Sequence, residues 1–185
     1  LAAGDRQIDL YSGLMHLFDT HYDQNLPLLN LPFFLNPTAR KNTKSENIHL
    51  AWLGGAWHWF DLVSVIKLLK VWLPENPNLK FSFVGIEHPT DSRLHNSHDI
   101  QAAKSLVAEF PNQVQMISWM NYQEYCTWLQ NLDLAIVISK PGNESRFSIR
   151  TRFCELLERQ IPIICNSGDY FSDWIQKYRL GQIVS

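Results

Sequence analysis

The chain has 185 residues, enough for one domain and a short further segment. Its 16 Lys and Arg against 18 Asp and Glu give a formal charge of -2, which argues against a sequence-independent nucleic-acid binder, because phosphate backbones are held by surplus cations. Hydrophobic residues make up 45% of the chain, which excludes a disordered protein, and no apolar run reaches the ~20 residues of a membrane span.

The first 47 residues are predicted to be the end of a preceding domain and an interdomain connection. Residues 8–18 have apolar side chains at helical spacing, which predicts an amphipathic helix. Two prolines favour an extended segment over 26–34, and the polar stretch 36–47 has the character of a linker. The start lacks both an initiator Met and a signal pattern, so we expect this sequence to come from the middle of a longer protein.

From Ile48 onward, short apolar segments alternate with segments of helical spacing. Asp61 is predicted to cap the first helix, whose apolar face is Leu62, Val65, Ile66, Leu69 and Trp72 and which Pro74 and Pro77 end. Strands are predicted at 48–53, 81–84, 114–118, 134–138, 161–165 and 182–184. Further helices are predicted at 99–110, at 122–130, after a polar loop at 139–147 and ending near Arg159, and at 170–178.

This alternation predicts an α/β fold with βαβ units and a parallel sheet buried on both faces. Right-handed crossovers leave few arrangements, and the Rossmann-like doubly wound sheet is the commonest of them. We therefore expect residues 48–185 to form one such domain, truncated at its C-terminus.

In a doubly wound sheet of order 3-2-1-4-5-6, ligands bind where the order reverses, at the carboxyl ends of the first and fourth strands. Those ends carry the loops 54–59 and 139–148. Gly54 and Gly55 permit close approach of the backbone to a ligand. The second loop leads into a helix whose free N–H groups attract anions.

Arg150 and Arg152 lie in the first turn of that helix. Cations there are unfavourable against the helix dipole unless an anion lies between them, so the pattern indicates a phosphate or diphosphate site. The alternative is that both arginines point outward or pair with Glu144 and Glu155.

Other kinds of site have less support. The sequence contains no GxGxxG fingerprint, no GxxxxGK[ST] phosphate loop and no GxSxG nucleophile elbow. The polar stretch with His95, His98 and Asp99 contains metal-ligand residue types, but a solvated loop or helix cap explains it better, so no metal site is predicted. The three cysteines (Cys126, Cys154 and Cys165) lack CxxC spacing and are expected to be reduced thiols of a cytosolic protein.

Four stretches resemble a known family: GGAWHWFD, FVGIEHP, VQMISWMNYQEY and NESRFSIRTRFCELLERQIPIICNSGD. Together they are similar to the C-terminal, donor-binding domain of GT-B glycosyltransferases of the glycosyltransferase-4 ("group 1") type. The block from Ser148 to Arg152 is the most specific piece. DRQIDLYSGLM and LPFFL also look like the end of the preceding domain and the connection in that family.

The resemblance implies retaining transfer of a sugar from a nucleotide-diphosphate donor to an acceptor, without a metal ion or separate cofactor. It places the protein in polysaccharide biosynthesis in the cytoplasm and is compatible with peripheral association at the inner face of the membrane. The acceptor, a sugar or lipid-linked glycan, would be recognised by the N-terminal domain. We therefore expect this fragment to be inactive alone and to bind no nucleic acid.

The resemblance also assigns roles to particular residues. Glu155 would hold the ribose hydroxyls, since a carboxylate accepts from two vicinal hydroxyls, and Glu144 would lie near the donor sugar and diphosphate. His58, or the two arginines from the other side, would replace the basic residue that the family often has after the first strand. The predicted catalytic residues are Glu144, Arg150 and Arg152, and the donor-binding residues are Gly54, Gly55, His58, Trp119, Met120, Ser148, Thr151 and Glu155.

Two other functions remain open at this point. One is a non-catalytic parallel-sheet binding module, in which tryptophans near the site (Trp52, Trp57, Trp59 and Trp119) line a contact with a second domain. The other is a nucleotide-sugar epimerase of the same architecture, which needs no acceptor.

Overall fold

A computed structural model describes residues 6–7, 9–10, 45–87 and 97–184. The strands are β1 (Ile48–Leu53), β2 (Leu79–Val84), β3 (Val114–Ile117), β4 (Leu134–Val137), β5 (Ile163–Asn166) and β6 (Gly181–Val184). The helices are α2 (Leu62–Glu75), α3 (His98–Glu109), α4 (Tyr122–Leu129), α5 (Asn143–Phe147), α6 (Thr151–Glu158) and α7 (Ser172–Tyr178).

The N-terminal predictions lie almost wholly outside the described residues. Arg6, Gln7, Asp9 and Leu10 are helical, which agrees with the start of the predicted helix. The rest of that helix, the extended segment at 26–34 and residues 36–44 of the predicted linker lie outside the described part of the chain.

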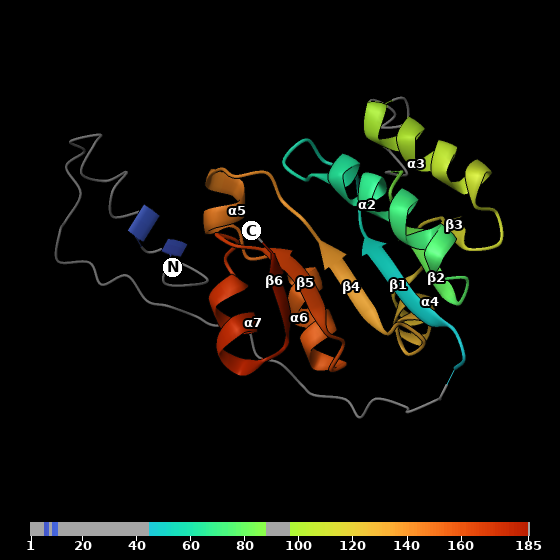
Figure 1. The fold of residues 1–185 in the computed structure, drawn as a ribbon. Helices are drawn as coiled ribbons and strands as arrows, with labels where there is room; N and C mark the ends of the chain where they lie inside the picture. The colour runs from blue at the N-terminus through green and yellow to red at the C-terminus, as the bar shows by residue number, and fades with distance from the viewer. Residues whose placement is uncertain (1–5, 8, 11–44, 88–96, 185) are drawn as a thin grey trace, which may run out of the picture.

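The six strands form one sheet of order β3-β2-β1-β4-β5-β6, in which every neighbouring pair is parallel. This is the predicted doubly wound arrangement, with its reversal between β1 and β4. In Figure 1, α2 and α3 lie over one face of the sheet, while α4 and α6 lie over the other. Helices on both faces explain why the strands read as nearly continuous apolar runs.

The core lies between the central strands and their helices. Trp52, Phe81 and Phe83 are fully buried on β1 and β2, and α2 packs a buried stripe against them. The Asp61 side chain accepts a hydrogen bond from the Ser64 backbone N–H (3.2 Å), which confirms the predicted cap of α2. The stripe ends at Leu73, however, and not at the half-buried Trp72, because it follows steps of three and four residues from Leu69.

Two boundaries differ from the predictions for clear physical reasons. The predicted polar loop at 139–147 contains α5, whose five residues, NESRF, are too few and too polar to show an apolar period. The strand β5 begins at Ile163, not at Ile161, because Pro162 has no N–H to donate within the sheet. Within residues 45–87 and 97–184, no helix combines the length and the apolar character needed to cross a bilayer.

Candidate functional site

The loops after β1 and β4 meet at the carboxyl edge of the sheet, as the strand order predicts (Figure 1). Phe60 forms an isolated antiparallel bridge with Ser139. The Lys140 backbone N–H donates to the Trp59 carbonyl (2.8 Å), and the Asp61 N–H donates to the Ile138 carbonyl (3.0 Å). Backbone hydrogen bonds therefore hold the two loops side by side at the point where the strand order reverses.

Arg152, in the first turn of α6, reaches across this junction to β1. Its guanidinium donates to the Leu53 carbonyl and lies directly against Gly54. A Cβ atom on Gly54 would lie 2.5 Å from Nη2 of Arg152, and the φ of Gly54 is +88°, a conformation that side chains disfavour. The glycine thus makes room for the guanidinium and brings a cation to the predicted phosphate site.

Arg150 takes a different path and is buried. Only 7% of the residue is exposed, and its guanidinium donates to the Asp169 carboxylate and to the Ser139 hydroxyl (2.7 Å). The alternative pairing of this arginine with Glu144 or Glu155 is therefore wrong, because Asp169 is its ion-pair partner. Its Nε and Nη2 atoms have no hydrogen-bond partner among the residues that the structure describes.

The ring of Phe60 contacts both arginines. The guanidinium carbons of Arg150 and Arg152 each lie 4.9 Å from the centre of its ring, at cation–π distance. Burial, and after it the neighbouring charge of Arg150, lower the pKa of Arg152 to about 10. Arg152 therefore remains charged at neutral pH, and an added anion would relieve the repulsion between the two cations.

Glu155 lies one turn further along α6, beside Arg152. Its carboxylate is hydrogen bonded to the Tyr125 hydroxyl of α4, and Arg152 interacts electrostatically with both groups. Burial raises the pKa of Glu155 and of Tyr125. The structure thus brings together Gly54, Arg152 and Glu155, three residues for which roles were predicted.

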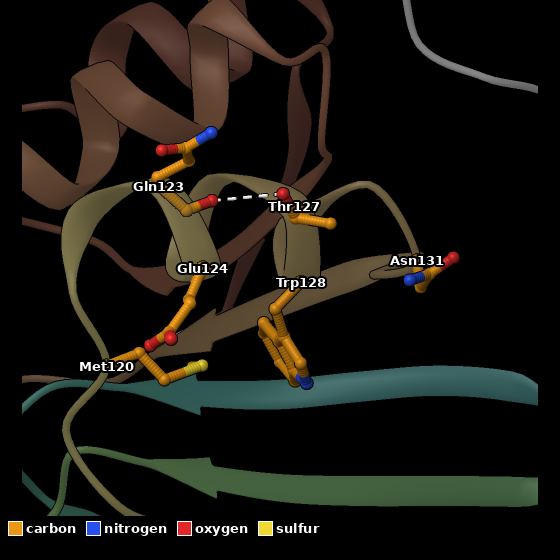
Figure 2. A pocket seen from close by; sticks show the side chains of 6 residues that line it. All are labelled: Met120, Gln123, Glu124, Thr127, Trp128 and Asn131. Carbon is orange, nitrogen blue, oxygen red and sulfur yellow. Dashed lines mark hydrogen bonds between the residues drawn. The ribbon is translucent and has the colours of Figure 1, made fainter.

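Trp119 and Met120, two of the predicted donor-binding residues, follow β3 at the same edge of the sheet. The indole of Trp119 lies 3.4 Å from the position of a Cβ on Gly85, and Trp119 is 52% exposed. Met120 lines a shallow hollow of about 500 Å³ along α4. Figure 2 shows the side chains of Met120, Glu124 and Trp128 directed to the same side of that helix.

Other predicted residues are exposed, apart from the half-buried Ser148. Glu144 is exposed in the first turn of α5, and Ser148 ends that helix by donating its N–H to the Glu144 carbonyl (3.0 Å). Thr151 is exposed at the start of α6. His58 is exposed beside the ring of Trp59, with centroids 4.7 Å apart. The roles assigned to these residues stay predictions.

Three residues of the site had no predicted role. Lys140 donates to the His58 carbonyl (2.9 Å) and adds an exposed cation to the junction. Asp169 and Tyr125 lie within the stretches that carry the family resemblance, but only their partners in space, Arg150 and Glu155, reveal what they do. Sequence spacing gives no signal for such contacts between distant segments.

The stretch around His98 and Asp99 agrees with the helix-cap interpretation. Ser97 caps α3 by accepting from the Ile100 N–H (3.3 Å), so His98 and Asp99 lie in a capped first turn, while His95 lies outside the described residues. All three cysteines are free thiols, of which Cys165 is buried.

The fold and the position of this edge define a class of protein: the chain has the fold of the C-terminal domain of GT-B glycosyltransferases. No protein-family model and no curated protein matches the sequence. Solved structures do match. WaaG, a glycosyltransferase involved in lipopolysaccharide biosynthesis, has a TM-score of 0.55 and 16% identity over 76% of this chain and 34% of its own.

Two further structures extend the comparison. The C-terminal domain of LpcC, a group 1 family glycosyl transferase from Francisella tularensis, has a TM-score of 0.55 and 16% identity over 75% of this chain and 67% of its own. The pneumococcal O-GlcNAc transferase GtfA, in complex with UDP and GlcNAc, has a TM-score of 0.63 and 14% identity over 91% of this chain. The chain spans 30% of the length of GtfA, so the likeness concerns one part of that enzyme.

Proposed function

We propose that this chain is the donor-binding domain of a glycosyltransferase. It binds a nucleotide-diphosphate sugar at the carboxyl ends of β1 and β4, and the complete protein transfers the sugar to an acceptor with retention and without a metal ion. The observation that carries the proposal is the guanidinium of Arg152, held against Gly54 at the start of α6 where the strand order reverses.

The diphosphate of the donor would lie between Arg152 and the N-terminal turn of α6. Arg152 is charged at neutral pH, and the first N–H groups of a helix attract anions. Arg150 is too buried to be the first contact, but its guanidinium lies against the same Phe60 ring as that of Arg152, and its Nε and Nη2 atoms have no hydrogen-bond partner among the described residues. As the leaving diphosphate gains charge, these groups stabilise it, which is how preorganised cations lower a reaction barrier.

The nucleoside would lie along α6 toward α4. Glu155 holds the ribose hydroxyls, and its hydrogen bond with Tyr125 fixes the orientation of the carboxylate. The base lies beside Trp119 and Met120, while Glu144, His58, Ser148 and Thr151 line the side of the donor sugar and phosphates. GtfA, one part of which has the same fold, was solved with UDP, which supports a nucleotide as the ligand.

The rest of the proposal concerns the complete protein. Residues 1–47 connect this domain to a preceding domain that recognises a sugar or lipid-linked glycan acceptor, and residues 48–185 bind the donor. The protein acts in polysaccharide biosynthesis in the cytoplasm, at or near the inner face of the membrane. It uses no separate cofactor, since the nucleotide-sugar is the substrate.

Calorimetric titration of the chain with UDP, GDP and ADP tests the proposal. We expect one of the three to bind, and Arg152→Ala to weaken that binding by about 1.5–3 kcal/mol, the cost of losing a charge-assisted hydrogen bond. Lys67→Ala, a change to an exposed cation on α2, is the matched control and should leave the affinity unchanged. No binding at millimolar nucleotide, or equal affinities for both variants and the unmodified chain, would refute the donor site.

Assays of the full-length protein with a nucleotide-sugar distinguish sugar transfer from the two alternative functions. A protein that binds the donor but neither hydrolyses nor transfers its sugar would be a binding module. One that releases an altered nucleotide-sugar without an acceptor would be an epimerase.

A further inference from the structure

Arg6, one of the few described residues of the N-terminal segment, contacts the turn that contains Asp169, beside the candidate site. Its Nη1 donates to the carbonyls of Asp169 (3.1 Å), Arg146 (3.4 Å) and Gly168 (3.5 Å). Its Nη2 donates to the Asp173 carboxylate (2.8 Å). The guanidinium carbon also lies 5.7 Å from the ring centre of Tyr170.

These contacts form a niche suited to a guanidinium. The polar groups that contact Arg6 are all acceptors, and one of them, the Arg146 carbonyl, belongs to the last turn of α5. Arginine presents five donors in a planar fork, whereas lysine presents three from one atom and cannot reach all four acceptors. A hollow of about 390 Å³ lies beside Arg6, lined also by Gly142, Ser145 and Ser167, so small solutes can reach the niche.

The turn that Arg6 holds carries the counter-ion of Arg150. The Asp169 carbonyl accepts a hydrogen bond from Arg6, and its carboxylate accepts one from Arg150. The other carboxylate oxygen accepts from the Phe171 N–H (3.2 Å), and the Tyr170 N–H donates to the Ser145 carbonyl (2.9 Å). One short turn therefore links the loop after β4, the start of α7 and the buried ion pair.

We infer that Arg6 is a positioning residue for the anion site. By fastening the Asp169 turn to the end of α5, Arg6 fixes the carboxylate that orients Arg150, so a residue of the N-terminal segment contributes to the geometry of the site. The effect on ligand binding rests on the proposed function, whereas the effect on the turn does not. Arg6 thus couples the segment predicted to end the preceding domain to the site of this one.

Arg6→Ala tests the coupling by two measurements on the same chain. We expect the amides of Tyr170, Phe171 and Ser172 to exchange hydrogen at least about tenfold faster, because the turn opens more often. We also expect the dissociation constant for the nucleotide diphosphate to rise about three- to tenfold. Lys177→Ala, which removes an exposed cation from the same helix as Asp173, should change neither quantity.

Rescue distinguishes positioning from a general loss of structure. Guanidinium chloride at about 20 mM, far below the molar concentrations that unfold proteins, should restore nucleotide affinity to Arg6→Ala, while equal sodium chloride should not. Arg6→Lys should recover part of the affinity through Asp173 alone.

The outcomes separate this inference from the proposed function. If the unmodified chain binds no nucleotide but Arg6→Ala speeds amide exchange in the turn, the proposed function fails and the positioning of Asp169 stands. If exchange at Tyr170, Phe171 and Ser172 is unchanged, Arg6 does not hold the turn. If affinity falls but guanidinium gives no more recovery than sodium chloride, the niche does not act as a guanidinium site.

Discussion

Asp169 is fully buried, and its carboxylate neutralises a guanidinium that is itself almost fully buried. Asp169→Asn keeps the shape but leaves the charge of Arg150 uncompensated. We expect the free energy of unfolding to fall by about 3 kcal/mol, the lower end of the cost of breaking a buried ion pair, because the amide oxygen still accepts. Urea unfolding measures this change.

A double variant provides the control for that prediction. Asp169→Leu together with Arg150→Met removes both charges, and replacing a whole buried pair by apolar groups is often neutral for stability. If Asp169→Asn is as stable as the unmodified protein, then the charge of Arg150 does not need the Asp169 carboxylate to compensate it.

His49, at the start of β1, is half-buried and belongs to a second group of polar side chains. Its Nε2 lies 2.7 Å from the Ser82 hydroxyl, which also accepts from the Gln115 amide (3.0 Å). The imidazole packs edge-on against Trp128. Burial lowers the pKa of His49 below 6.5, although a backbone hydrogen bond at Asn131 and the charge of Asp133 oppose the shift.

This shift predicts a pH dependence of stability. Between the lowered pKa of the folded state and about 6.5, the unfolded chain binds more protons at His49, so stability rises with pH. The contribution is complete above about pH 6.5 and is lost as pH falls toward the folded pKa. Urea unfolding from pH 8 to pH 5 should show a steeper loss for the unmodified chain than for His49→Gln, and parallel curves would contradict the prediction.

At the residue scale, the sequence predicted which residues meet but not how each side chain points. The strand order alone brings Gly54 to Arg152, and the position of Glu155 on the same helix follows from its spacing. The burial of Arg150 could not be predicted, because its partner Asp169 lies 19 residues away in the next loop. Contacts of this kind depend on the packing of loops, which leaves no periodic signal.

At the scale of elements, the strands were predictable because parallel strands covered on both faces are short apolar runs. The run from Leu134 to Val137 is an example, and it became β4 at the centre of the sheet. The short α5 was missed because it packs few apolar residues and depends on the loop around it. Ser145, its buried residue, donates its hydroxyl to the Gly142 carbonyl (2.9 Å).

The pairing of β6 with β5 depends on one close backbone approach. A Cβ on Gly181 would lie 1.9 Å from the Ile163 carbonyl oxygen, a backbone atom that cannot move aside without breaking the pair. We expect Gly181→Ala to destabilise the protein by at least about 2 kcal/mol and to expose the amides of β6 to hydrogen exchange. Gly142→Ala is the matched control, since a Cβ there has nothing within 4 Å.

This prediction is contradicted if the amides of β6 in Gly181→Ala are as well protected from hydrogen exchange as those of the unmodified protein. In that case the strand tolerates a wider separation from β5 than the structure indicates.

At the scale of the whole molecule, a ligand that binds only the folded chain raises its stability. At 100 times its dissociation constant, the nucleotide diphosphate should add about 2.7 kcal/mol to the free energy of unfolding. Urea unfolding with and without the nucleotide measures this gain, and Arg152→Ala at the same nucleotide concentration should gain less. Equal gains in the two proteins would place the ligand away from Arg152.

The guanidinium of Arg152 fills the volume that any larger residue at position 54 would occupy. The two positions, 98 residues apart in the chain, therefore constitute a single steric unit. We expect homologous sequences to keep glycine at position 54 even where residue 152 is small, because a φ of +88° disfavours any side chain. A mutagenesis library at position 54 should therefore return mainly glycine, and simultaneous variation of position 152 should not change that result.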